Sequence, residues 1–264
     1  MAQRRPRRSS ASTSWEPVAE WYAGWVGAKG SEYHRRLVIP VVLELLAPAP
    51  GEHILDIGAG TGVLAPHITK AGACYTGLDA SRKLLAFARR HHGAHGRFLH
   101  GDATCLAAMP ELHAGTFDAV VFMLSIQDMD PLDVVLASAT WALRAGGRVV
   151  LLLTHPCFRV PRQSGWGWDA QRKLQYRRID RYLTPLSVPM SPRTATQHGT
   201  TRSYHRPLEA SINTLAACGL VVDQAREIPA CQASSKGPSA RAANLANQEI
   251  PLFLGLRAWK YTGL

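Results

Sequence analysis

The chain has 264 residues, enough for one α/β domain with a full core. Hydrophobic residues make up 46% of the sequence, which excludes a wholly disordered chain. No apolar run reaches the roughly 18 residues of a membrane-spanning helix, and no apolar stretch follows the basic N-terminus as in a signal peptide. Five widely spaced cysteines, none in a CxxC pair, favour a reducing cytoplasm over a disulfide framework or a cysteine-rich metal site.

The formal charge of +11 is unevenly distributed along the chain. Residues 1–14 hold four arginines and no acid, and we interpret them as a disordered basic tail. Residues 155–206 hold ten Lys and Arg against two Asp, together with six large aromatic residues. A solvated charge run rarely carries so many aromatics, so this local excess needs a local explanation.

Strand and helix signals alternate after the N-terminal region. The predicted strands cover residues 53–57, 74–78, 97–100, 117–124 and 148–153. The predicted helices between them cover residues 61–71, 81–92 and 131–143. This alternation predicts an α/β fold with a doubly wound, mostly parallel sheet and helices on both faces.

The alternation breaks over residues 155–206, which contain five prolines and little clean periodicity. An irregular segment of this length inside a compact domain is either disordered or functional, often a lid. Because its aromatics argue for order, we predict a substrate cap here, inside a single domain over residues 15–264. The alternation resumes with a helix at 207–218 and strands at 220–228 and 252–260, with a loop predicted over 231–247.

The sharpest signal is ILDIGAGTG at residues 54–62, where the first predicted strand leads into a helix. Glycines at such a junction let the backbone turn tightly and approach a ligand closely. Asp79 ends the second strand, where a carboxylate can accept both ribose hydroxyls, and Asp102 ends the third, where it can meet an adenine amine. A dinucleotide site is the alternative, but its glycines fall at i, i+2 and i+5, whereas here they fall at i, i+2 and i+4, two residues after Asp56.

Together, LDIGAGTG, GLDAS, GDA, FDAVVFMLSIQDMDP and LRAGGRVVLL resemble the ordered motifs of class I S-adenosylmethionine (SAM)-dependent methyltransferases of the small-molecule type. The resemblance covers about residues 52–153 and implies a Rossmann-like, seven-stranded sheet whose last strand is antiparallel. It also implies SAM as the cofactor and S-adenosylhomocysteine as its product. The cofactor-binding residues that it implies are Tyr22, Asp56, Gly58, Ala59, Gly60, Asp79, Ala80, Asp102, Ala103 and Met123. Small-molecule members of this family often have an N-terminal tyrosine that closes over the cofactor, and Tyr33 is a second candidate for that role beside Tyr22. The alternative for either ring is that it packs on the core.

The region after the fourth strand departs from two subfamilies. Enzymes that methylate amino groups of nucleic acids carry an Asp/Asn-Pro-Pro-aromatic motif here, whereas this chain has LSIQD at residues 124–128, so we do not expect nucleic acid as a partner. Many small-molecule members carry a His pair where this chain has Gln127 and Asp128, so a base inferred from that pair does not carry over. Asp128 and Asp130 could bind a metal, but Asp130 before a proline is better explained as a helix N-cap, and we predict no metal.

Two histidines follow the cofactor motifs and are predicted to serve catalysis. His155 comes directly after the fifth strand, at the sheet edge where open α/β folds bind ligands, and His205 ends the cap segment. A histidine near neutral pKa could act as the base for a hydroxyl acceptor, although a structural hydrogen bond is the alternative for each.

Four residues are predicted to bind the acceptor, which we expect to be aromatic or anionic: Gln127, Arg159, Trp166 and Trp168. We therefore predict methyl transfer to an O, N or C atom of a small molecule in the cytoplasm. RNA or protein methylation, cofactor binding without turnover, and a non-methylating SAM-using reaction remain alternatives, because a fold alone does not determine a reaction.

Overall fold

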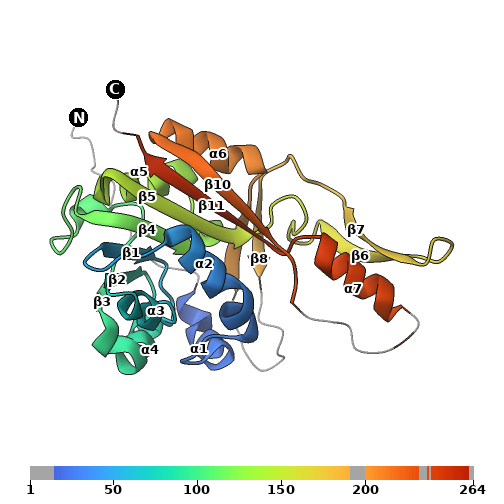
Figure 1. Cartoon of the computed structure of the whole chain (residues 1–264), viewed down its shortest axis with the longest axis horizontal. Helices are drawn as coiled ribbons and strands as arrows, with labels where there is room; N and C mark the ends of the chain where they lie inside the picture. Colours follow the sequence, from blue (N-terminus) through green and yellow to red (C-terminus); the bar gives the residue numbers. More distant parts are fainter. Residues whose placement is uncertain (1–14, 191–199, 232–236, 238, 262–264) are drawn as a thin grey trace, which may run out of the picture.

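The computed structural model describes residues 15–190, 200–231, 237 and 239–261, so the predicted basic tail lies outside it (Figure 1). Within these residues, seven strands form one central sheet: β1 (His53–Ile57), β2 (Cys74–Asp79), β3 (Arg97–His100), β4 (Phe117–Met123), β5 (Leu143–Thr154), β10 (Leu220–Ile228) and β11 (Phe253–Lys260). Their order is β10-β11-β5-β4-β1-β2-β3. β11 runs antiparallel to both of its neighbours, and the other pairings are parallel. The expected sheet is thereby confirmed.

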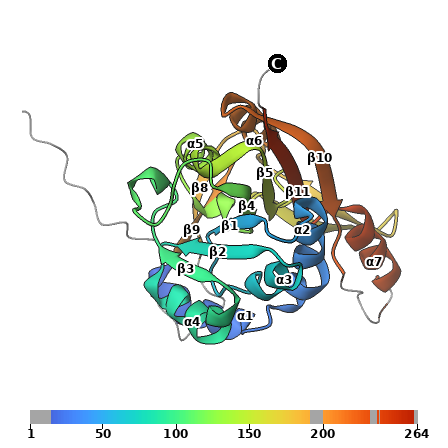
Figure 2. The ribbon, with the colours of Figure 1, turned by 60° about the vertical axis from the view of Figure 1, so that its left-hand side comes forward.

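Helices cover both faces of the sheet (Figures 1 and 2). The α-helices are α1 (Ala19–Val26), α2 (Ile39–Leu46), α3 (Ala65–Lys70), α4 (Arg82–His92), α5 (Leu132–Ala142), α6 (Leu208–Ala217) and α7 (Ala240–Glu249). Single turns lie at η1 (Glu16–Val18), η2 (His34–Val38), η3 (Gly93–His95), η4 (Leu106–Ala108) and η5 (Ile126–Asp128). Helices α5 and α6 pack on one face, and α2, α3 and α4 on the other. A hydrophobic core lies on each face of the sheet, and the side chains of β4 alternate between them. Val120 and Phe122 pack in the core on one face, and Val121 and Met123 pack in the core on the other.

The helix after the glycine motif is shorter than predicted. It begins at Ala65 rather than residue 61, because residues 58–64 form an open loop. Pro66 therefore lies in the first helical turn, where its missing N–H costs nothing, and produces no kink. Helix α4 agrees with the prediction, and the Ser81 hydroxyl accepts a hydrogen bond from the Leu84 N–H at its start, 3.2 Å away.

A buried ion pair joins α2 to the sheet. Arg148 of β5 donates hydrogen bonds to both carboxylate oxygens of Glu52, at 2.8 and 2.6 Å. The same guanidinium donates to the backbone carbonyls of Leu46 and Ala47, where α2 ends. One arginine thus satisfies carbonyls that the helix leaves without an internal partner.

Residues 155–206 are more regular than predicted. They contain two antiparallel hairpins, one of β6 (Ser164–Asp169) with β7 (Leu174–Ile179), the other of β8 (Leu186–Met190) with β9 (Thr201–His205). Glycines in β6 and Pro189 in β8 interrupt the alternation that would have revealed these strands. The predicted loop at 231–247 is also partly wrong, because it contains most of α7.

The two hairpins lie in different places. Strands β6 and β7 extend away from the central sheet and pack beside α7, whereas β9 packs against η5, next to the end of β4 (Figure 1). Only the second hairpin therefore approaches the carboxyl edge of the sheet. No helix among the described residues is both long and apolar enough to cross a membrane.

Candidate functional site

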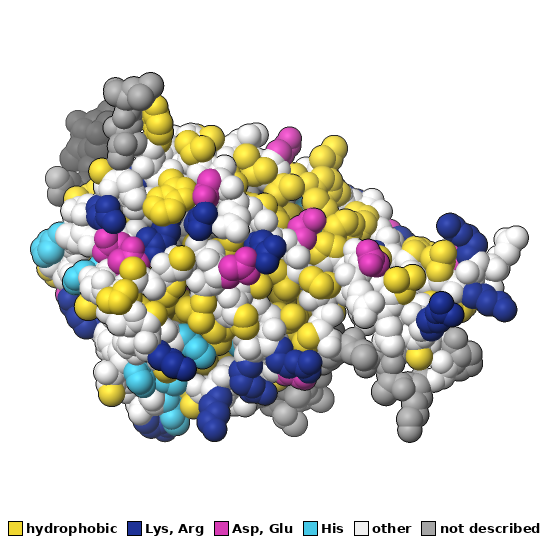
Figure 3. Space-filling model, viewed as in Figure 1, with side chains coloured by type: hydrophobic (Ala, Val, Ile, Leu, Met, Phe, Trp, Pro, Cys, Tyr) yellow, Lys and Arg dark blue, Asp and Glu magenta, His cyan; other side chains and the backbone are white. Residues whose placement is uncertain are grey.

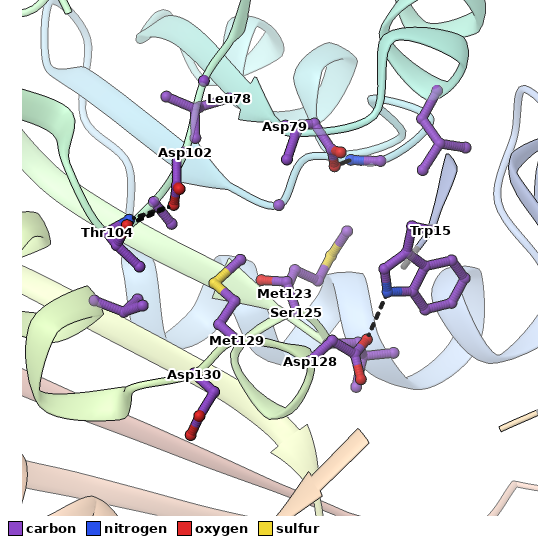
Figure 4. Close-up of a pocket in the computed structure, with 18 of the residues that line it drawn as sticks. Trp15, Leu78, Asp79, Asp102, Thr104, Met123, Ser125, Asp128, Met129 and Asp130 are labelled. Atoms are coloured by element: carbon purple, nitrogen blue, oxygen red, sulfur yellow. Dashed lines mark hydrogen bonds between the residues drawn. The ribbon is translucent and has the colours of Figure 1, made fainter. Parts of the chain in front are cut away.

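A cavity of about 500 Å³ opens at the carboxyl ends of β1 to β4 (Figure 4). This edge is where open α/β sheets bind ligands, because the strand order reverses between β1 and β4. The residues that line it are Trp15, Tyr22, Gly58, Gly60, Leu78, Asp79, Ala80, Leu84, Gly101, Asp102, Ala103, Thr104, Met123, Leu124, Ser125, Asp128, Met129, Asp130, Val135, Arg202 and Tyr204. Eight of the ten predicted cofactor residues are among them, and their role there remains a prediction.

The glycine loop lies close against the segment that follows β4. Gly58 has φ +76°, and a Cβ atom added to it would lie 2.4 Å from Cβ of Ser125. The Ser125 hydroxyl in turn donates a hydrogen bond to the Ile57 carbonyl, 2.6 Å away. Gly60 has φ +55° and faces the ring of Tyr22. Side chains at these two positions would both strain the backbone and fill the cavity.

Asp79 is held in a fixed orientation at the end of β2. Its two carboxylate oxygens accept hydrogen bonds from the backbone N–H groups of Gly60 and Ser81, each 2.8 Å away. Burial raises its pKa above the ordinary range, although both of these hydrogen bonds oppose the shift. A carboxylate has about four acceptor positions, so these two contacts leave capacity for a ligand that offers hydroxyls.

The segment that follows β3 completes the half of the cavity that contains Asp79. One carboxylate oxygen of Asp102 accepts hydrogen bonds from both the backbone N–H and the hydroxyl of Thr104, at 2.9 and 2.7 Å. Apolar Leu78, Ala103 and Val135 line the space around it. An apolar slot with one carboxylate suits a flat heterocycle with an amino group.

Asp56 of β1 and Ala59 within the glycine loop are both buried and do not line the cavity. Asp56 is 1% exposed, and one of its oxygens accepts a hydrogen bond from the Tyr75 hydroxyl, 2.7 Å away. Its other oxygen has no hydrogen-bond partner among the described residues. Burial raises the pKa of Asp56 to about 7. The hydrogen bond from Tyr75 thus joins β1 to β2, and contact of Asp56 with a cofactor stays a prediction.

The opposite half of the cavity holds a residue whose role the sequence did not reveal. Asp128 ends η5 and accepts a hydrogen bond from the indole N–H of Trp15, 3.2 Å away, and another from Ser203. Burial raises the pKa of Asp128 to about 7. Figure 4 shows Asp79 and Asp102 on one side of the cavity and Asp128 and Asp130 on the other, with Met123 and Ser125 between them.

Neither predicted catalytic histidine lines this cavity. His155 is 1% exposed, and its Nδ1 accepts the backbone N–H of Cys157 at 3.2 Å. The proton therefore sits on Nε2, which donates it to Glu227 at 2.9 Å, and burial lowers the pKa of the ring. His205 donates to the Tyr182 carbonyl at 2.6 Å. Both histidines therefore make hydrogen bonds outside the cavity, and a catalytic role for either stays a prediction.

The four predicted acceptor residues also lie outside the main cavity. Gln127 and Arg159 line a separate cavity of about 30 Å³, together with His205. The guanidinium groups of Arg159 and Arg177 both lie over the ring of Trp166, 5.1 and 5.2 Å from its centre. Trp168 is on the β6–β7 hairpin and is 46% exposed. The hairpin therefore does not bring its tryptophans to the cavity.

The cavity is acidic although the chain is basic. Four aspartates line it, at positions 79, 102, 128 and 130, against one guanidinium, that of Arg202. On the face shown in Figure 3, Lys and Arg side chains are spread over the body of the molecule and also occur at the end formed by the β6–β7 hairpin. In the described part of the chain, no group of three or more His, Cys, Asp or Glu is arranged to hold a metal ion.

Comparison with known proteins agrees with this geometry. A family described as "Methyltransferase domain" matches residues 54–147. The chain is 32% identical over 114 residues to a ubiquinone biosynthesis O-methyltransferase of Ralstonia nicotianae, covering 43% of this chain and 48% of that protein. It is 30% identical over 118 residues to a demethylmenaquinone methyltransferase of Tropheryma whipplei, covering 43% and 46%. The chain thus spans about half the length of these curated relatives.

Among solved structures, a SAM-dependent methyltransferase of Mesorhizobium loti superimposes with a TM-score of 0.67 at 24% identity, covering 88% of this chain and all of that one. This likeness extends beyond the matched sequence segment, because it covers most of the chain. Residues 54–147 are thus similar to the methyltransferase domain family, and the chain as a whole has a fold found in solved SAM-dependent methyltransferases.

Proposed function

We propose that this protein transfers a methyl group from SAM to a small-molecule acceptor. The observation that carries the proposal is one cavity with two chemically different halves. The first half joins the glycine loop to Asp79 and Asp102, and the second joins Asp128 to Tyr204 and Arg202. A cofactor in the first half would face an acceptor in the second, across Met123.

The residues present fit SAM. Gly58 and Gly60 leave room where any side chain would intrude, and the oriented carboxylate of Asp79 can accept ribose hydroxyls. Asp102 and Ala103 can flank an adenine. When bound, SAM supplies a methyl carbon made electrophilic by its sulfonium. The acidic lining supports binding of this cation, because opposite charges attract strongly in a partly dehydrated site.

The second half of the cavity supports a neutral or cationic acceptor rather than the anionic one suggested by the cap arginines. Apart from Arg202, none of the described cap arginines lines the cavity, and Arg206 pairs with Asp130 at 2.7 Å. Trp15, Tyr22 and Tyr204 supply aromatic surface that can exclude water and hold the acceptor in line with the methyl group.

The relatives support the small-molecule class. Their names specify ubiquinone biosynthesis O-methylation and demethylmenaquinone methylation. The described cysteines are all free thiols, which supports the cytoplasmic location that we propose.

Calorimetry with SAM, S-adenosylhomocysteine and NAD tests the cofactor. We expect the first two to bind and NAD not to bind. A panel of small phenols, amines, quinols and short RNAs, assayed for S-adenosylhomocysteine release, then tests the acceptor class. Tight NAD binding without a response to S-adenosylhomocysteine would refute the proposal. Release of S-adenosylhomocysteine only in the presence of RNA would mean that the acceptor is a polymer and not a small molecule.

A further inference from the structure

We propose that Asp128 receives the proton that the acceptor loses on methylation, so that the acceptor atom carries a hydroxyl or N–H hydrogen. This inference rests on the proposed function and assigns a residue and an acceptor chemistry to it. The evidence is the position of the Asp128 carboxylate, its hydrogen-bond donors and the small number of competing bases among the described residues that line the same cavity.

The backbone brings Asp128 to the cavity by an unusual turn. Leu124 follows β4 with φ +57°, a left-handed conformation that non-glycine residues seldom adopt. Two hydrogen bonds hold it there: its N–H donates to the Leu152 carbonyl at 2.7 Å, and its own carbonyl accepts from the Gln127 amide at 2.6 Å. Strained backbone of this kind concentrates at functional sites. Here it directs η5, and with it Asp128, across the end of β4.

The Asp128 carboxylate has neutral donors and no ion-pair partner. Trp15 donates to one oxygen at 3.2 Å, and Ser203 contributes a second hydrogen bond. Among the described residues, no Lys, Arg or His forms an ion pair with it, whereas neighbouring Asp130 is paired with Arg206 at 2.7 Å. A partly buried carboxylate without a cation beside it is energetically unfavourable, and such groups are candidates for proton transfer.

Few other groups in the cavity could take this proton. The titratable or charged side chains that line it with Asp128 are Tyr22 from α1, Asp79 after β2, Asp102 after β3, Asp130 after η5, and Arg202 and Tyr204 from β9. Asp79 and Asp102 belong to the cofactor half, and Asp130 is paired. Burial, with the negative charge of Asp128, raises the pKa of Tyr22, so its hydroxyl stays protonated.

The proton balance of the step is complete. The acceptor atom forms a bond to the methyl carbon while the bond from that carbon to the sulfonium sulfur breaks, and its electron pair stays on sulfur. The acceptor's proton passes to a carboxylate oxygen of Asp128, which becomes neutral and later releases the proton to water. Its pKa, raised by burial to about 7, keeps much of the carboxylate ionised at neutral pH while leaving it basic enough to take a proton.

The first test needs no acceptor. The indole N–H of Trp15 contacts Asp128, so its NMR resonance in the S-adenosylhomocysteine complex reports the ionisation of that carboxylate. We expect it to titrate with a midpoint near 7, to lose the titration in Asp128→Asn, and to keep it in Asp133→Asn, an exposed aspartate at the start of α5. A resonance that does not move between about pH 5 and 9 would overturn the proposal.

The second test uses turnover of simple phenols, aromatic amines and aromatic carboxylic acids. Asp128→Asn should lower kcat at least about 100-fold and remove its acidic limb, without changing SAM affinity, and Asp128→Glu should restore part of the rate. Turnover of the Asn variant at the wild-type rate, or methylation of carboxylic acids but not of phenols or amines, would contradict the proposal. Failure of the wild type to bind SAM would instead refute the methyltransferase function itself.

Discussion

The indole N–H of Trp15 donates a hydrogen bond to the carboxylate of Asp128, 113 residues later in the chain, over 3.2 Å. The same N-terminal segment is tied to the start of α4, because Glu16 accepts a hydrogen bond from the Ser81 hydroxyl at 2.5 Å. Residues 15–26 therefore contribute Trp15 and Tyr22 to the wall of the cavity and extend along both of its halves.

Replacing Trp15 by Phe should raise the pKa of Asp128 further. The Trp15 hydrogen bond favours the ionised carboxylate, so its loss favours the neutral form. The acidic limb of kcat should then move to higher pH, with little change at high pH. A pH–rate profile measures this shift, and Trp25→Phe, at an exposed tryptophan of the same segment, is the control. An unshifted profile in Trp15→Phe would show that this hydrogen bond does not influence the ionisation on which kcat depends.

Asp79→Asn should weaken the binding of both SAM and S-adenosylhomocysteine. Hydrogen bonds to charged groups are worth about 1.5–3 kcal/mol, so the loss should be roughly tenfold to a hundredfold. Calorimetry measures it directly. Asp118→Asn is the matched control, because Asp118 lies at the opposite end of the sheet, where it contacts His53 and Arg144. Equal affinity in wild type and Asp79→Asn would mean that the ribose contact is misassigned.

Gly58→Ala should remove SAM binding and destabilise the fold more than Gly51→Ala. Both glycines have a positive φ, +76° and +83°, so both substitutions strain the backbone by about 1 kcal/mol or more. Only at Gly58 would the new methyl group meet Cβ of Ser125, at 2.4 Å, whereas Gly51 has no neighbouring atom within 4 Å. Thermal unfolding with and without SAM compares the two. Similar losses at both sites would show that the close approach to Ser125 is unimportant.

Glu52→Gln should lower stability at neutral pH by about 1.5–3 kcal/mol, an effect that disappears in acid. The hydrogen bond from Arg148 lowers the pKa of Glu52 in the folded protein. The stabilisation by the ionised form is therefore complete above the unfolded pKa of about 4.3 and is lost as pH falls through the lower folded value. Urea unfolding from neutral to acidic pH measures this. Glu32→Gln, which removes an exposed pair with Arg36, should cost less than about 1 kcal/mol.

Tyr204→Ala should raise the KM of the acceptor, whereas Trp168→Ala should leave it unchanged. Tyr204 lines the acceptor half of the cavity, and Trp168 lies on the distant hairpin. Both variants should bind SAM normally. Steady-state kinetics with the identified acceptor distinguishes them. An increase in KM for Trp168→Ala but not for Tyr204→Ala would mean that the acceptor binds at the β6–β7 hairpin.

Local sequence patterns were sufficient to predict the strands of the central sheet and the helices between them. Strands covered on both faces are nearly continuous apolar runs, as in residues 117–123, and helices between them carry recognisable starts such as Ser81. The same patterns misplaced the beginning of α3, because a loop precedes the helix, and that of β5, because the strand already contains Gly146 and Gly147. They missed β6 to β9, whose short strands stabilise one another in pairs and carry glycine and proline where alternation should appear.

The sequence by itself determined which residues stand at the strand ends, since parallel strands all bring their carboxyl ends to one edge. This rule brought Asp79, Asp102 and Met123 to the cavity. Only the tertiary structure decided that His155 turns toward Glu227, that the tryptophans of β6 lie away from the site, and that Trp15 meets Asp128. Those contacts join segments far apart in the chain, and they depend on how hairpins and the N-terminal segment pack, which no local periodicity encodes.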